Sequence, residues 1–326
     1  MPAEGCVVGV DGGGSKTHAA VADLAGRVLG ESVEVGSPHT ALGFAGAAAV
    51  VDRAVWAALA AAGVAPAAVL HAGCYLSGVD LPEEAAALTA ELAAHPWTDA
   101  GLTVDNDVLA VLRAGTQSAD AAAVVCGTGM NAVAVRADGA RAQLLAMGAP
   151  SGDWGGGLGL ADEVLWHAAR AEDGRGPGTA LREALLGWTG AASVRELAIE
   201  VAGGRRRTTA WVDRVPEVLA LARAGDDVAR ALVQRQGVEI ATCAAAVLAR
   251  LGLAARRVPV VVGGGIGTSG DAQLEAAIRA GLAERAPLAE LVVLRTSPVL
   301  GAVRLALASL SPPSGAPARR RSPGAR

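Results

Sequence analysis

A glycine-rich segment, Asp11–Thr17, lies between two strand-like runs near the start of the chain. An apolar run precedes it and the run Thr17–Ala22 follows it. In a Walker A loop, glycine and lysine are adjacent and the loop leads from a strand into a helix. Here Ser15 separates Gly14 from Lys16 and a second strand follows, so we predict a hairpin turn. Such a turn can hold a phosphate, because glycines permit positive φ and let backbone N–H groups converge on an anion.

The order of the predicted elements occurs twice along the chain. The first half gives strands and helices in the order βββαβαβα, at Val7–Val10, Thr17–Ala22, Arg27–Glu34, Thr40–Ala62, Ala67–Leu76, Pro82–Ala94, Leu102–Val104 and from about Asp107. The second half gives the same order, at Ala121–Cys126, Asn131–Arg136, Arg141–Met147, helices within Gly156–Arg250, Val258–Val262, Asp271–Leu282, Leu291–Leu294 and Val299–Leu310. A duplicated unit predicts two similar α/β domains with a cleft between them. We place them at 1–116 and 117–310, with extra helices inserted in the second, and expect a disordered tail at 311–326.

A second glycine turn, GTGMN, occupies the matching place in the second half. We predict that the two turns hold the phosphates of ATP through Gly12, Gly13, Gly14, Ser15, Lys16, Thr17, Gly127, Thr128 and Gly129, with the hydroxyls of Ser15 and Thr17 as further donors. Asp11, at the end of a strand, is placed to hold Mg²⁺ through water. A third cluster, with Gly264 and Gly265, is predicted to let adenine or ribose approach the backbone. For each cluster taken singly, an ordinary glycine hairpin or βα turn is the alternative, but two such turns at matching places of the repeat favour a phosphate site.

Composition excludes several classes of function. Hydrophobic residues make up 52% of the 326 residues, which is enough for two domain cores. The net charge of −4 argues against a nucleic-acid partner, which requires clustered positive charge. The four cysteines show no spacing typical of a zinc site or a disulfide framework. The uncharged stretch Ala54–Val79 is predicted to be a helix followed by a strand rather than a membrane span. With no signal peptide apparent at its start, we expect a cytoplasmic protein without membrane partners, and the sequence is compatible with a homodimer.

Seven segments together resemble a known family. They are VVGVDGGGSKT, LSG at 76–78, VDND at 104–107, CGTGMN, SGDWGGG at 151–157, VVGGGI and SPVLGA at 297–302. In this order they resemble the BadF/BadG/BcrA/BcrD ATPase family over about residues 5–308, and within it the N-acetylglucosamine kinase branch of the sugar kinase/Hsp70/actin superfamily. The resemblance implies ribonuclease H-like, actin-like ATPase domains, ATP and Mg²⁺ as cofactors, and phosphorylation of an amino sugar on its 6-hydroxyl.

Transfer of a phosphoryl group to a hydroxyl requires positioning, charge stabilisation and a carboxylate that accepts the proton. From the residues alone, Asp105 and Asp107 are equal candidates for this base, and Asp107 could instead cap a helix. The family resemblance selects Asp107. It also implies that the sugar is contacted by Ser77, Gly78, Asn131 and Asp153.

Two places depart from the family pattern. Trp154 stands where the family more often has Glu, and it is equally a sugar-stacking or a core residue. Pro38 stands where a sugar-contacting Asn is usual, so His39 or Thr40 would have to replace it, which puts N-acetylglucosamine itself in question. As a second base His39 is disfavoured, and we expect it to be a surface-loop histidine.

Other functions compete with the kinase. Activator ATPases of 2-hydroxyacyl-CoA dehydratase-type radical enzymes resemble this fold but use cysteines to hold an iron–sulfur cluster. The cysteines here are scattered, and the sugar-contact motifs LSG and SGDWGGG are present, so the kinase is favoured. A regulator without catalysis is disfavoured because Asp11, Asp107 and Asp153 all remain. A ROK-type sugar kinase is disfavoured because its cysteine-rich zinc motif is absent from the sequence.

Overall fold

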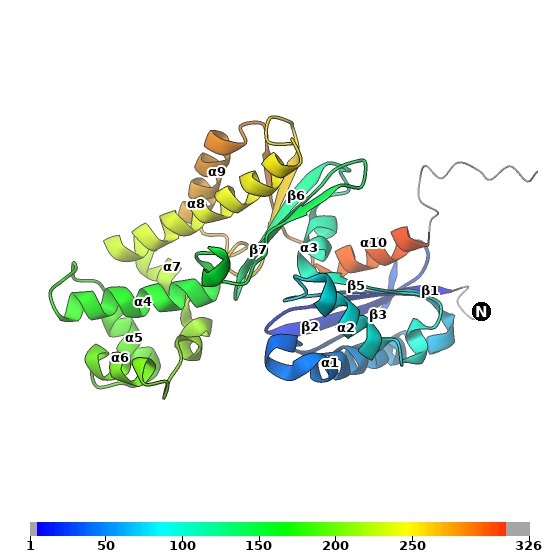
Figure 1. Cartoon of the computed structure of the whole chain (residues 1–326), viewed down its shortest axis with the longest axis horizontal. Helices are drawn as coiled ribbons and strands as arrows, with labels where there is room; N and C mark the ends of the chain where they lie inside the picture. Colours follow the sequence, from blue (N-terminus) through cyan, green and yellow to red (C-terminus); the bar gives the residue numbers. More distant parts are fainter. Residues whose placement is uncertain (1–4, 311–326) are drawn as a thin grey trace, which may run out of the picture.

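The computed structural model describes residues 5–310, which form two five-stranded mixed sheets (Figure 1). The first sheet holds β1 (Cys6–Gly12), β2 (Lys16–Ala22), β3 (Val28–Val35), β4 (Val69–Leu76) and β5 (Leu102–Asn106). The second holds β6 (Ala121–Cys126), β7 (Met130–Val135), β8 (Arg141–Gln143), β9 (Pro259–Gly263) and β10 (Glu290–Val293). The predicted tail at 311–326 lies outside the described residues.

The two sheets have the same topology. Their strand orders are β3-β2-β1-β4-β5 and β8-β7-β6-β9-β10. In each, the first strand pairs antiparallel with the second and parallel with the fourth. The helices are α1 (His39–Ala62), α2 (Pro82–Leu92), α3 (Asp107–Gly115), α4 (Gly156–Glu172), α5 (Leu181–Thr189), α6 (Val194–Ala202), α7 (Pro216–Arg223), α8 (Asp227–Arg250), α9 (Ala272–Arg285) and α10 (Val299–Ser309). The duplicated βββαβαβα fold with extra helices in the second half is therefore confirmed.

The central strands are buried on both faces, which explains their continuous apolar sequence. Every residue of β1 is buried, and α1 packs on β2 and β3 on one side of the first sheet. α8 packs in the same way on β6 and β7 of the second sheet. The inserted helices α4 to α7 extend away from the sheets at one end of the molecule (Figure 1). Their buried leucines and valines continue the core that α8 forms.

The last helix of each half crosses to the other half. α10, at the end of the second half, packs on β1, β4 and β2 of the first sheet, where Val299, Val303 and Ala306 meet Val7. α3, from the first half, packs on β6, β9 and β7, and it also packs against α10 (Figure 1). The domain boundary between residues 116 and 117 therefore remains a prediction from the sequence. In the structure, helices from each half pack into the core of the other.

Helix α1 is long and apolar enough to span a membrane by length and composition alone. In the fold, 44% of its apolar window is buried, and its buried side faces the first sheet. The uncharged stretch Ala54–Val79 is the end of α1 followed by β4, as predicted. One predicted strand is shorter than expected: β8 ends at Gln143, because the chain then turns through Ala146 and Gly148, both with positive φ, into a short 3₁₀ helix.

The crossing of α3 and α10 depends on Gly301. A Cβ atom at this position would overlap the carbonyl oxygen of Ala110, so only glycine allows this approach. We expect Gly301→Ala to lower the free energy of unfolding by about 1–3 kcal/mol, because the helices must shift apart. Gly187→Ala in α5 is the matched control, since its Cβ would meet open space. The urea unfolding midpoints of both variants are compared with that of the wild type. A wild-type midpoint for Gly301→Ala would show that the two helices separate without loss of stability.

Candidate active site

The predicted site residues of the first half follow the carboxyl ends of three adjacent parallel strands. Gly12 at the end of β1 pairs with Leu76 at the end of β4, and Leu76 pairs with Asn106 at the end of β5. Parallel strands bring their carboxyl ends to one edge of a sheet, where ligands of α/β proteins usually bind. The structure therefore brings together the first glycine turn, the LSG segment and Asp107.

The first glycine turn is a tight hairpin between β1 and β2. The N–H of Gly13 donates to the carbonyl of Lys16 at 2.8 Å, and the tip residues Gly14 and Ser15 are exposed, as is Lys16. Thr17 is fully buried, and its hydroxyl donates to Oγ of Ser37 at 2.9 Å. The prediction of Thr17 as a free hydroxyl donor is therefore wrong. Its side chain instead fastens the turn to the segment that precedes α1.

The second glycine turn has the same form between β6 and β7. The N–H of Gly127 donates to the carbonyl of Gly129 at 3.0 Å, and Thr128 and Gly129 are exposed at the tip. The first residues of α4 pack behind it, where the N–H of Gly157 donates to the carbonyl of Gly127 at 2.8 Å. Backbone N–H groups at a turn and at a helix start are suited to anions.

The three glycine clusters converge. A Cβ built on Gly14 would lie 3.5 Å from Oγ1 of Thr128, so the two turns face each other across the junction of the halves. In the third cluster, Gly264 has φ +82° and lies so close to the backbone of Cys126 that a Cβ there would overlap it. Gly265, beside it, is exposed. The clusters thus lie around one region, as a nucleotide with its phosphates requires.

Asp107 is the first residue of α3, but it does not cap the helix. That role belongs to Asn106, whose Oδ1 accepts from the N–H of Val108 at 3.0 Å. The Asp107 side chain is half-buried at the sheet edge. Burial, followed by repulsion from Asp11 and Asp80, raises the pKa of Asp107 to about 8. Perturbed carboxyl groups of this kind are concentrated at functional sites.

Asp105, the competing candidate, is already paired. Its carboxylate accepts from both terminal nitrogens of Arg141, at 2.7 Å and 2.9 Å, in a bidentate ion pair that joins β5 to β8. A carboxylate held in this way is a structural link between the halves. The geometry therefore favours Asp107 as the base.

Asp11 lies at the end of β1 and is only 8% exposed. Burial raises the pKa of Asp11 to about 6, while the Lys16 ammonium acts in the opposite direction. A buried carboxylate near the Asp107 carboxyl would be stabilised by a cation, so the residue fits a Mg²⁺ ion. Because residues 5–310 offer no cluster of three or more His, Cys, Asp or Glu side chains for a metal, such an ion would be bound mainly by phosphate oxygens and water.

Asp80 is a site residue that the sequence analysis missed. Its Oδ1 accepts two hydrogen bonds of 2.8 Å, one from Nδ2 of Asn106 in the first half and one from Nδ2 of Asn131 in the second. Burial, and next the charge of Glu84, raise the pKa of Asp80 to about 6, while the two asparagines lower it. The sequence did offer a signal for Asp80: it is a carboxylate two residues after Gly78, just beyond the end of a buried strand.

The SGDWGGG segment places Asp153 near this cluster. Oδ2 of Asp153 accepts from the N–H of Gly148 at 2.8 Å and from the hydroxyl of Ser151 at 2.7 Å. The charge of Asp153 also raises the pKa of Asp80, so the two carboxylates lie near each other across the junction of the halves. Asn131 is buried and bound to Asp80, and Ser77 and Gly78 are half-buried beside it. The four predicted sugar-contacting residues therefore gather around Asp80.

Trp154 is held within the protein. Its Nε1 donates to Glu163 at 2.7 Å, and the guanidinium of Arg235 lies 3.9 Å from the centre of its ring. The half-buried ring also packs against the core of the second half. These contacts favour the structural interpretation over stacking on a sugar.

His39 is not the surface histidine that the sequence suggested. It is 8% exposed, and its ring stacks on Phe44 at 4.9 Å between centroids. It lies against Gly78, the second residue of the predicted sugar-binding pair. The sequence hid this burial because it arises from contacts with Gly78, after β4, and with Glu84 in α2, far along the chain.

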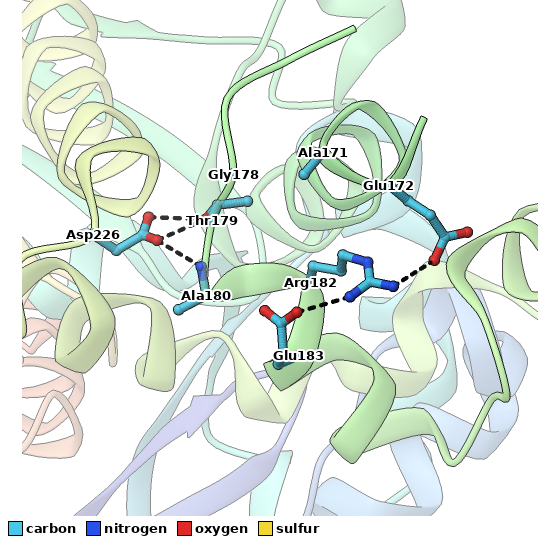
Figure 2. A pocket seen from close by; sticks show the side chains of 8 residues that line it. All are labelled: Ala171, Glu172, Gly178, Thr179, Ala180, Arg182, Glu183 and Asp226. Carbon is cyan, nitrogen blue, oxygen red and sulfur yellow. Dashed lines mark hydrogen bonds and ion pairs between the residues drawn. The ribbon is translucent and has the colours of Figure 1, made fainter. Parts of the chain in front are cut away.

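A separate pocket lies between the end of α4 and the start of α5 (Figure 2). Its charged groups satisfy one another. Arg182 binds Glu183 at 2.8 Å and Glu172 at 3.3 Å, while Asp226 accepts from Thr179 and from the N–H of Ala180. None of the predicted site residues lines this pocket, so it is distinct from the candidate active site.

The model of the BadF/BadG/BcrA/BcrD ATPase family matches residues 8–306. The chain belongs to this family. The expected family is thus confirmed over nearly all of the described structure, and ATP is the nucleotide that it supports. The family assignment also agrees with three glycine clusters that meet at one junction.

Within and around this family, individual proteins resemble the chain. A curated N-acetyl-D-glucosamine kinase from Dictyostelium discoideum is 25% identical over 187 residues, which is 55% of this chain and 59% of that relative, less than two thirds of its length. A crystal structure from Chromobacterium violaceum, described provisionally as an N-acetylglucosamine kinase, is 26% identical with a TM-score of 0.74, covering 94% of this chain and 100% of that one. A ROK family glucokinase from Streptomyces griseus, solved with glucose and AMPPNP, is 19% identical with a TM-score of 0.55, covering 93% and 99%, and shows the fold alone.

The raised pKa of Asp107 predicts a pH-dependent effect on stability. A folded-state pKa of about 8, above the unfolded value of about 3.9, means that this carboxyl destabilises the fold increasingly as pH rises from about 4 to 8. We expect Asp107→Asn to raise the urea unfolding midpoint at pH 8 and to change it little near pH 4. The exposed Asp162→Asn in α4 is the control. A gain for Asp107→Asn that is equal at both pH values would contradict the assigned shift.

Proposed function

We propose that this protein is an ATP-dependent amino-sugar kinase, with N-acetylglucosamine as the first substrate to test and the 6-phosphate as product. One observation carries the proposal: the half-buried Asp107 carboxyl lies at the strand edge that ends in the first glycine turn, close enough to Asp11 for that charge to raise its pKa, and the first turn faces the second. A carboxyl in that position suits proton abstraction from a hydroxyl at the end of a phosphate site. The names of the relatives from Dictyostelium discoideum and Chromobacterium violaceum support the amino-sugar assignment.

In the proposed reaction, the 6-hydroxyl oxygen of the sugar bonds to the γ-phosphorus of ATP while the bond to the bridging oxygen of ADP breaks. Asp107 accepts the hydroxyl proton. The N–H groups of the turns at Gly13–Ser15 and Gly127–Gly129 hold the phosphates, and Ser77, Gly78 and Asp153 orient the sugar. Asp11 would hold a hydrated Mg²⁺, which supplies charge neutralisation at the phosphates.

Replacing Asp107 with Asn removes the proton acceptor and preserves the size of the side chain. We expect turnover to fall roughly 10²–10⁴-fold while ATP binding is largely retained. Steady-state ADP release and a nucleotide-binding titration measure the two effects. Asp162→Asn should change neither. Near-normal turnover of Asp107→Asn would remove this residue from the role of base.

The pH profile tests the electrostatic coupling to Asp80. Because Asp107 must be ionised to accept a proton, kcat/KM for the sugar should rise with pH up to about 8. Asp80→Asn keeps an oxygen for Asn106 and Asn131 but removes a negative charge that raises the pKa of Asp107. We therefore expect the acidic limb of the profile to move to lower pH. An unchanged limb would show that the two carboxyls are not coupled.

The substrate is identified by ADP release with glucosamine, N-acetylglucosamine, N-acetylmuramic acid, glucose and mannose derivatives. Stimulation by an amino sugar supports the proposal. The dehydratase-activator alternative is the weaker one, because Cys6, Cys74 and Cys126 are buried in separate strands and Cys243 lies in α8. A dark-coloured anaerobic preparation without stimulation by any sugar would favour the activator.

A further inference from the structure

The buried ring of His39 carries a polar atom without a partner. Its Nδ1 has no hydrogen-bond partner among residues 5–310, although it is shielded from solvent. Its Nε2 lies 3.5 Å from Oε1 of Glu84. Buried polar atoms in folded proteins are almost always hydrogen-bonded, so an exception at this place calls for a specific explanation.

The carboxylate beside His39 is fixed by other bonds. Oε2 of Glu84 accepts from the N–H of Asp80 at 2.8 Å and from the N–H of Leu81 at 2.9 Å, at the start of α2. Its remaining oxygen therefore points to Nε2 of His39. A proton on Nε2 suits this carboxylate, and it leaves Nδ1 as an acceptor. The missing partner of Nδ1 is then a donor, such as a hydroxyl or an amide N–H.

His39 faces the LSG segment. A Cβ built on Gly78 would lie 3.2 Å from Cε1 and 3.5 Å from Nδ1 of His39. Gly78 has φ +78°, so a side chain there is disfavoured both by the backbone and by the ring. Asp80, two residues further on, is bound to Asn106 and Asn131. The unpartnered nitrogen therefore lies next to Gly78, one of the predicted sugar contacts.

The segment that carries His39 is fixed to the phosphate turn. The N–H of Ser37 donates to the carbonyl of Gly13 at 3.2 Å, and the hydroxyl of Ser37 accepts a hydrogen bond from the hydroxyl of Thr17. Gly43, with φ 71° and ψ 167°, separates the first turn of α1 from the rest of the helix. His39 thus lies in the first turn of α1, directly after a segment that is hydrogen-bonded to the phosphate turn.

We propose that His39 is a specificity residue of the sugar site, where its Nδ1 accepts a hydrogen bond from a hydroxyl or an amide N–H of the amino sugar. The proposal rests on the proposed kinase function. The sugar contact would be a ring nitrogen. The ring itself is positioned by Glu84, which lies at its Nε2, and by Phe44, on which it stacks.

Three variants separate this role from packing. His39→Phe keeps the aromatic stack and removes both nitrogens, His39→Asn places an amide near the position of Nδ1, and His39→Gln places one near that of Nε2. We expect His39→Phe and His39→Gln to raise the KM for the sugar about tenfold, as for one lost hydrogen bond, with the KM for ATP unchanged. His39→Asn should keep most of the wild-type value.

The sugar group is identified by repeating the assay with deoxy analogues of the substrate. The analogue that lacks the group bound to His39 should be poor for the wild type, and His39→Phe should cause no further loss with it. His95→Phe is the matched control, because His95 also stacks on an aromatic ring, that of Trp97, and binds a carboxylate, that of Asp52, away from the site.

The outcomes are distinct. An unchanged sugar KM in His39→Phe, or an equal rise for sugar and ATP, would overturn the role of His39 and leave the kinase proposal in place. A wild-type protein that phosphorylates none of the sugars would overturn both. If His39→Phe does not fold, His39→Asn and His39→Gln decide the question, and equal kinetics of these two would overturn the proposal.

Discussion

The close crossing of α3 and α10 at Gly301 fixes the relation between the two sheets. Each of these helices belongs by sequence to one half and covers the sheet of the other, so the halves share their apolar cores. Interiors packed at this density resist small displacements. The carboxyl ends of β1, β4 and β5 are therefore held opposite the glycine turn that follows β6. The proposed phosphate site depends on this placement, because it is built from both glycine turns.

The same placement concentrates negative charge. Burial raises the pKa values of Asp11, Asp80 and Asp107, and the charges of Asp11 and Asp80 raise that of Asp107 further. No arrangement of this kind stabilises the free protein, since burial and like charges both oppose ionisation. It is the arrangement expected where stability is given up for function, at a site that binds a cation or moves a proton.

The sequence analysis succeeded where local chemistry decides the structure. The interruption between Gly14 and Lys16, with a strand after it, excluded a P-loop, and the repeat of this pattern at GTGMN predicted two similar halves. It failed where long-range contacts decide. Asp80 gains its importance from asparagines 26 and 51 residues away, and His39 is buried by Glu84 and Gly78. The exchange of α3 and α10 has no local signal, because their apolar faces fit either sheet.

Two polar interactions join the halves at the site, and their strengths determine how firmly the halves are held together there. The Arg141–Asp105 pair is about one-third exposed, and such ion pairs contribute about 0–1 kcal/mol. The bond from Asn131 to Asp80 is more buried and involves a charge, which places it at about 1.5–3 kcal/mol. Both values are within reach of the binding energy of a sugar or a nucleotide. Under the proposed function, ligand binding would therefore let the halves move at this edge while the α3–α10 crossing holds. Asp80 is the point through which such movement would reach the rest of the site, because it binds Asn131 in one half and Asn106, next to Asp107, in the other.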